Sequence, residues 1–108
     1  DVNVTLNTML QWFKKADKQY LMNEQEREIL GEMSGEITIY RGSNEDEYYD
    51  ALSWTTNIDI ARKFSRRFND DGTVFSAKIN KADILAYFDA EEEVVVNYKK
   101  LKDIEIIE

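Results

Sequence analysis

The spacing of apolar residues in this 108-residue chain is helical up to about position 35 and mostly strand-like after it, with one helical stretch in between. The part before that position carries one apolar stripe at the three- and four-residue intervals of a helix: Leu6, Met9, Leu10 and Phe13. We expect this stripe to lie in the core. After position 35 apolar and polar residues alternate, as in residues 73–79, which is typical of strands with one buried face. Helices first and strands afterwards indicate an α+β fold.

Two further helices have recognisable starts. Asn23, followed three residues later by Glu26, has the spacing of a capping box, so a second helix is expected from there to the glycines at 31 and 35. Thr56 or Asn57 can cap a third helix over about residues 58–68, and one helical turn is expected at 81–85. Strands are expected over five β-branched or alternating stretches: 36–41, 51–55, 73–79, 92–97 and 103–108.

No repeat, linker or low-complexity segment divides the chain, and its length suits one domain. With 43% hydrophobic residues, a chain of this size can bury a core of its own. We therefore expect a single domain over residues 1–108, with a helical part at 1–35 and a β-rich part at 36–108.

Two residue types are missing, and their absence limits the possible chemistry. The chain has no His, which excludes Ser-His-Asp and Cys-His catalysis and His-ligated zinc within it. It has no Cys, which excludes disulfides and thiolate nucleophiles and is typical of a reducing compartment. Any catalysis must therefore use carboxylates, hydroxyls, Arg or Lys.

The charge balance is acidic, with 14 Lys and Arg against 22 Asp and Glu, a formal net charge of −8. Nucleic acid and anionic membranes both require a basic surface, so we expect neither as a partner. A basic protein would be an electrostatic match. The simpler interpretation of the acidity is that it keeps the chain soluble.

Three short segments could carry chemistry. The first is Tyr40-Arg41-Gly42 at the end of an expected strand, where Arg41 can grip phosphate oxygens with its planar fork and Gly42 lets a ligand approach the backbone. The second is Ser53-Trp54-Thr55, in which a hydroxyl can orient a carboxylate or bind a ribose. When each segment is taken alone, a strand end with a turn glycine is the simpler explanation of the first, and a strand edge before a helix cap is the simpler explanation of the second.

The third segment is Glu91-Glu92-Glu93, directly before a β-branched run. On a strand Glu91 and Glu93 would share one face, and Glu92 would point to the other. Carboxylates beside a glycosidic bond can stabilise the positive charge that develops on the sugar as the bond breaks. A solvated acidic loop is the alternative interpretation.

The three segments occur in the order that is found in the arginine–serine–glutamate class of ADP-ribosyltransferases, which the chain resembles over about residues 36–97. The stretch ITIYRG resembles the first motif of that class, ALSWTTNIDIARKFSRRF the second motif with the following helix, and FDAEEEVVV the Glu-x-Glu turn with its strand. The resemblance implies N-terminal helices packed on a split β-sheet core that is rich in antiparallel pairs. Small phage and bacterial domains of this superfamily are the most similar.

The resemblance also implies roles for individual residues. Arg41 would hold the phosphates of NAD, and the backbone of Gly42 would bind the nicotinamide amide. Ser53 would brace Glu93, which would bind the nicotinamide ribose and stabilise the oxocarbenium ion. Glu91 would orient or deprotonate the acceptor.

Other positions follow from the same motifs. Thr55 would belong to the NAD site, Phe64 would pack on the nicotinamide ring, and Arg66 and Arg67 would add phosphate contacts. Phe64 also lies on an apolar helix stripe, so core packing is the alternative for it, and a solvated helix end is the alternative for the two arginines. The triple glutamate leaves its register open, with Glu92 able to replace either neighbour.

The loop between residues 85 and 91 is short, which would reduce the acceptor platform to Tyr87, Phe88 and Asp89.

The activity that the resemblance implies is mono-ADP-ribosylation. ADP-ribose would pass from NAD to a protein side chain, with arginine as the acceptor that Glu91 implies, and nicotinamide would leave. NAD is then a substrate, and no metal is expected. An NAD glycohydrolase and a catalytically inactive domain that binds a nucleotide or a protein stay open as alternatives. The expected location is the cytoplasm of a bacterial or phage-infected cell, with secretion left open.

Overall fold

The computed structural model describes residues 2–43, 51–66 and 72–108, which form helices on an antiparallel sheet. The α-helices are α1 (Val2–Lys15), α2 (Lys18–Leu21), α3 (Glu24–Glu32) and α4 (Ile58–Ser65). The strands are β1 (Glu36–Ser43), β2 (Ser53–Thr55), β3 (Thr73–Asn80), β4 (Ile84–Phe88), β5 (Glu93–Val96) and β6 (Lys102–Ile106). Short 3₁₀ helices follow three strands: η1 (Lys81–Asp83), η2 (Asp89–Glu91) and η3 (Tyr98–Lys100). The expected α+β fold is confirmed. Within the described residues, no helix combines the length and apolar composition needed to cross a membrane.

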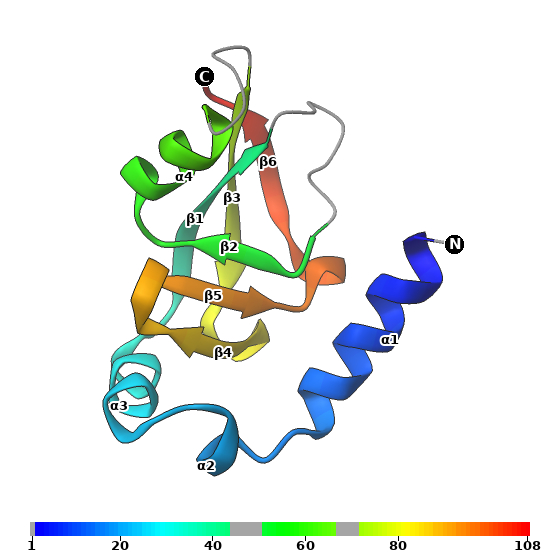
Figure 1. Cartoon of the computed structure of the whole chain (residues 1–108), viewed down its shortest axis with the longest axis vertical. Coiled ribbons are helices and arrows are strands. Elements are labelled where there is room, and N and C mark those ends of the chain that lie inside the picture. The colour runs from blue at the N-terminus through cyan, green and yellow to red at the C-terminus, as the bar shows by residue number, and fades with distance from the viewer. Residues whose placement is uncertain (1, 44–50, 67–71) are drawn as a thin grey trace.

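The sheet has two arms that meet at one point. Its strand order is β4-β5-β2-β1-β3-β6, and the arms join where Tyr40 of β1 lies opposite Thr55 of β2. In Figure 1 the strands β2, β5 and β4 run across the direction of β1, β3 and β6. The β1–β3 pairing spans the full length of both strands, from Glu36 opposite Asn80 to Ser43 opposite Thr73. A change of strand direction at the Tyr40–Thr55 junction leaves the end of β1 beside the start of the other arm.

The N-terminal helices cover the β4 end of the sheet (Figure 1). The expected capping box at Asn23 is confirmed, since Asn23 and Glu26 exchange side chain-to-backbone hydrogen bonds. The second carboxylate oxygen of Glu26 also accepts from the backbone N–H of Asp89, at 2.8 Å. Leu10 places α1 in the core, where it is fully buried, whereas Met9 is exposed and the prediction that it is buried was wrong. Met9 lies between Leu6 and Phe13 on the helix surface, at the edge of the stripe that packs against the core.

Helix α4 lies against β1 at very short range (Figure 1). A Cβ atom added to Gly42 would lie 1.8 Å from the carbonyl oxygen of Ala61 and 2.7 Å from the backbone nitrogen of Ser65. The missing side chain at Gly42 therefore serves the packing of α4, a reason that differs from the ligand approach expected from the sequence. Arg62 fixes the outer face of α4, because its Nε donates to Glu108 at 2.7 Å.

Several predicted boundaries differ from the observed ones. The strands expected at 51–55 and 103–108 are β2, which begins at Ser53, and β6, which runs from Lys102 to Ile106. The helical turn expected at 81–85 ends at Asp83, and the following residues form β4, which no local pattern indicated. The strand expected at 92–97 begins at Glu93. Helix α4 ends at Ser65, and the residues at 67 and 68, its expected end, lie outside the described part of the chain. Strand β4 depends on pairing with β5, a partner that the local sequence does not reveal.

Tyr87 of β4 makes the stability of the fold sensitive to alkaline pH. It is 4% exposed, and burial, followed by the hydrogen bond from its hydroxyl to Asp89 at 3.2 Å, raises the pKa of Tyr87 to about 12. In the unfolded chain a tyrosine loses its proton at about pH 10. Between these two pH values the folded state binds more protons, so the free energy of unfolding falls as the pH rises.

We therefore expect urea unfolding curves of the wild type to lose more stability between about pH 9 and about pH 12 than those of Tyr87→Phe. The other tyrosines and the lysines titrate in both chains, so the difference between the two slopes belongs to Tyr87. Parallel slopes would show that this phenol titrates normally in the folded state.

Candidate active site

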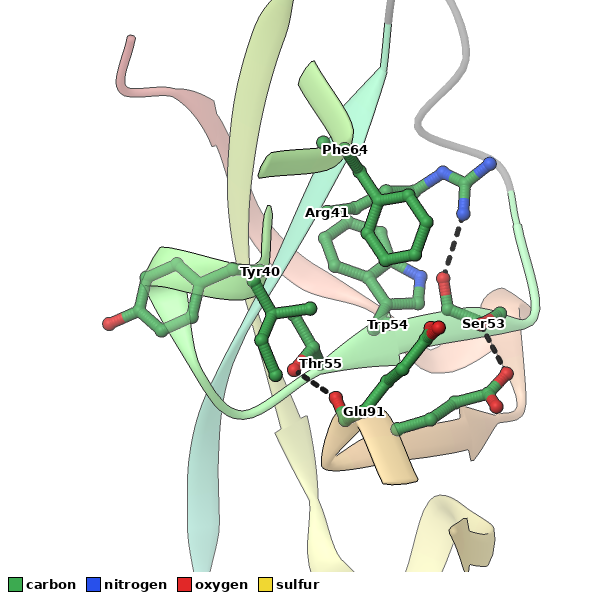
Figure 2. A pocket seen from close by; sticks show the side chains of 10 residues that line it. Tyr40, Arg41, Ser53, Trp54, Thr55, Phe64 and Glu91 are labelled. Carbon is green, nitrogen blue, oxygen red and sulfur yellow. Dashed lines mark hydrogen bonds between the residues drawn. The ribbon is translucent and has the colours of Figure 1, made fainter. Parts of the chain in front are cut away.

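A cavity of about 230 Å³ opens at the junction of the two arms (Figure 2). Its polar lining residues come from three separate stretches of the chain: Arg41, Ser53, Thr55, Glu91 and Glu93. Its other lining residues are Tyr40, Gly42, Trp54, Ile60 and Phe64. The cavity thus contains the residues that the sequence assigned to catalysis and, apart from Arg66 and Arg67, those it assigned to NAD, and it brings together one guanidinium and two carboxylates.

Arg41 connects the two arms of the sheet across the cavity. It lies near the end of β1, and its Nη1 donates to the carbonyl oxygen of Ser53 on β2, at 2.9 Å. Burial lowers the pKa of Arg41 below its ordinary value, yet a guanidinium keeps its charge at any pH near neutrality. A fixed positive charge of this kind favours an anionic group such as a phosphate.

Ser53 binds the carboxylate of Glu93 directly. The Ser53 hydroxyl donates to Glu93 Oε2, which Figure 2 marks as a dashed line from Ser53. The β2–β5 register places the two residues together, because Thr55 lies opposite Glu93 and Ser53 lies opposite Val95. A carboxylate that accepts a hydrogen bond from a fixed hydroxyl is held in one orientation toward the cavity.

The glutamates before β5 are arranged differently from the expected pair on one strand face. Glu91 ends the 3₁₀ helix η2, and Glu92 follows in the left-handed conformation with a φ of 46°. Thr55 Oγ1 reaches the carbonyl oxygens of Glu91 at 2.9 Å and of Glu92 at 3.1 Å and so fixes this turn. Glu91 and Glu93 still reach the same cavity, but through a turn rather than through strand alternation.

The side chain of Glu92 points elsewhere. Its Oε1 accepts from Asn57 Nδ2 at 3.4 Å and its Oε2 from Thr56 Oγ1 at 3.5 Å, at the start of α4. Asn57 is also the cap of α4, since its side chain accepts from the backbone N–H of Asp59. Glu92 therefore joins the turn to helix α4. Among the described residues that line the cavity, only Glu91 and Glu93 supply carboxylates.

The apolar wall of the cavity is aromatic. Figure 2 shows the ring of Phe64 in front of Trp54 and above Glu91, whose side chain points toward it. Trp54 is 2% exposed and its Nε1 donates to the carbonyl oxygen of Ala51, so the indole belongs mainly to the core. Phe64 is half-buried, with its ring on the cavity.

Sequence reasoning gave no site role to three lining residues, Tyr40, Trp54 and Ile60. The signal for Ile60 was available, because it lies one helical turn before Phe64. Tyr40 gave no comparable signal, since its place depends on the β1–β2 pairing.

A second hollow of about 400 Å³ lies next to the first and shares three of its residues: Ile60, Phe64 and Glu91. Lys63 and Ala90 complete its lining. Glu91 thus stands where the two hollows meet. Two molecules that occupied them would come together at this carboxylate.

Other expected site residues are not part of the cavity. Arg66 is exposed at the end of α4, and Arg67 lies outside the described residues. The short segment expected to be an acceptor platform is mostly strand, with Tyr87 buried in β4 and its N–H directed to the sulfur of Met22. Comparisons with protein-family models, with curated proteins and with solved structures found no match to this chain.

Proposed function

We propose that this protein binds NAD on a fold of the ADP-ribosyltransferase type and breaks its nicotinamide–ribose bond. The observation that carries the proposal is the hydrogen bond from Ser53 to Glu93 inside a cavity that also holds Arg41 and Glu91. A carboxylate held by a hydroxyl, with a guanidinium nearby, suits a substrate that has both an anionic diphosphate and a ribose that becomes positively charged.

The chemistry follows from these charges. As the bond between the ribose carbon and the pyridinium nitrogen breaks, nicotinamide leaves with the electron pair and a positive charge develops on the ribose. The Glu93 carboxylate stabilises that charge. The acceptor then forms the new bond to the same carbon and gives up a proton, for which Glu91 is the available base.

The size and lining of the cavity suit the nicotinamide half of NAD. A volume of about 230 Å³ is below the usual range for whole small-molecule sites, roughly 300–1,000 Å³. The ring of Phe64 can stack on the nicotinamide, and the guanidinium of Arg41 can bind the diphosphate. The adenosine half would then extend along the surface.

A protein side chain is the acceptor we favour. Glu91 lies at the border with the second hollow, which has room for a side chain, and its carboxylate would attract a cationic group such as an arginine. The net charge of −8 fits a basic target protein.

Water is the second candidate acceptor, which would make the protein an NAD glycohydrolase. The segment after Leu85 is used for β4, so only the short helix η2 remains to contact a protein acceptor.

The deciding experiment incubates the purified chain with NAD and measures nicotinamide release with and without basic proteins. Release that depends on Glu93 supports the proposal, and label from NAD on a protein identifies a transferase. Calorimetry with NAD separates the remaining outcomes. Heat of binding without nicotinamide release would indicate a nucleotide-binding domain. The absence of both binding and release would overturn NAD as the ligand.

Glu91→Gln should separate transfer from hydrolysis. If Glu91 acts on the acceptor, this change should lower transfer to a protein side chain by about 10²-fold and leave nicotinamide release into water nearly unchanged. The measurement compares labelled protein with free nicotinamide in the same reaction. Equal losses of both products would place Glu91 in the bond-breaking step instead.

A further inference from the structure

The N-terminal helices α1 and α2 lie at the other end of the molecule from α4 (Figure 1). Two large aromatic side chains on them are exposed. The exposed fractions are 59% for Trp12 and 86% for Tyr20, and Met9, one turn before Trp12, is 45% exposed. Trp12 and Tyr20 are both walls of a surface hollow of about 330 Å³, which is completed by Lys15, Ala16, Asp17 and Leu21. We call this set, with Met9, the N-terminal aromatic surface.

These aromatic residues are exposed because the core uses the opposite side of the same helices. Leu10 of α1 is fully buried, and Leu6 and Phe13 pack against the core beside it. Trp12 contacts the edge of Phe13, with ring centroids 5.0 Å apart and planes at 89°. Its position is therefore set before any ligand arrives. Asp17 caps α2 by accepting from the N–H of Gln19, which fixes the turn that presents Tyr20.

The charge of this region is opposite to that of the whole chain. Between residues 2 and 21 the charged residues are Lys14, Lys15 and Lys18 against Asp17 alone. The whole chain carries −8. Lys15 is itself a wall of the hollow, as is Asp17, and Lys14 and Lys18 are their neighbours in the chain. Three lysines against one aspartate would attract carboxylates that accompany an apolar side chain. Trp and Tyr are the residues that most often supply binding energy at protein interfaces.

We propose that the N-terminal aromatic surface docks a short acidic segment of a partner protein. An apolar side chain of the segment enters the hollow between Trp12 and Tyr20, and its carboxylates lie on Lys14, Lys15 and Lys18. A peptide is favoured over nucleic acid because a short segment stays within the lysines, whereas a phosphate backbone would run on over acidic surface. This inference is independent of the reaction at the cavity.

The test uses the full chain and a dye-labelled peptide of glutamate, leucine and phenylalanine, followed by fluorescence anisotropy. The wild type should bind it, and Trp12→Ser, Tyr20→Ser and Lys15→Glu should each weaken binding at least about tenfold. Lys100→Glu in η3 makes the same charge change at another exposed lysine and should leave the dissociation constant within about twofold. Far-UV circular dichroism checks that the exposed substitutions leave the fold intact.

Other probes decide against competing occupants. Equal binding of a peptide with lysine in place of glutamate would overturn the assignment of an acidic partner. Tighter binding of single-stranded oligothymidine would overturn the peptide proposal in favour of nucleic acid. Self-association in sedimentation that Trp12→Ser abolishes would overturn it in favour of a second copy of the chain. Loss of binding in Lys100→Glu to the same extent as in Lys15→Glu would show a general charge effect.

Discussion

Replacing Glu93 with glutamine is expected to lower nicotinamide release from NAD by about 10²–10³-fold, the usual effect of removing one charge-stabilising group from an active site. Glutamine keeps the size of the side chain, and its carbonyl oxygen can still accept the hydrogen bond from Ser53. The change therefore removes the negative charge and little else. NAD binding should persist, so the loss should appear in kcat rather than in the dissociation constant measured by calorimetry.

Glu92→Gln is the matched control for this experiment. It changes the same charge at the adjacent position, but the Glu92 side chain contacts Thr56 and Asn57 at the start of α4. We expect nicotinamide release to stay within about threefold of the wild type, since weak surface interactions contribute little. A large loss in Glu92→Gln with a small one in Glu93→Gln would assign the reacting carboxylate to Glu92.

The largest effect on stability is expected from Gly42→Ala. The new Cβ would lie 1.8 Å from the carbonyl oxygen of Ala61. This oxygen is a backbone atom of α4, so it cannot move away by a side-chain rotation. Helix α4 must move off β1, at a cost of about 3 kcal/mol, the upper end for overpacking. Urea unfolding at neutral pH measures this loss as a lower midpoint with little change in slope.

Gly31→Ala gives the comparison within the same chain. Gly31 lies in α3, and a Cβ at this position would have no atom within 4 Å. Alanine has the higher helix propensity, so this change should raise the free energy of unfolding by about 0.5–1 kcal/mol. If both alanine substitutions stabilise the protein, α4 does not pack on β1 at the distance described.

Some of this fold was accessible from the sequence because the relevant interactions are local. The capping box at Asn23 and Glu26 spans three residues, and the strand at 73–79 is marked by its own alternation. Strand β4 was missed because its run of mostly apolar residues has no alternation of its own and forms a strand by pairing with β5. The prediction that Met9 is buried was wrong for a related reason. Helical spacing identifies an apolar stripe but not which residues at its edge are exposed.

The candidate site divides in the same way. Arg41, Ser53 and Glu93 could be selected because their side-chain chemistry and order in the chain are visible in the sequence. The route of Glu91 into the cavity could not be predicted, because it depends on a left-handed residue and on two hydrogen bonds from Thr55. The packing role of Gly42 likewise depends on which helix crosses the strand.

The pairing of β2 with β5 has a consequence for how the site comes into being. Ser53 and Glu93 are 40 positions apart, and Arg41 contributes from the opposite arm of the sheet. Closing so long a loop is entropically costly and slow compared with forming a helix. During synthesis, the cavity can therefore form only after the chain has passed β5. A fragment that ends before Glu93 holds the guanidinium and the hydroxyl without their carboxylate, so the site is assembled as a whole or is absent.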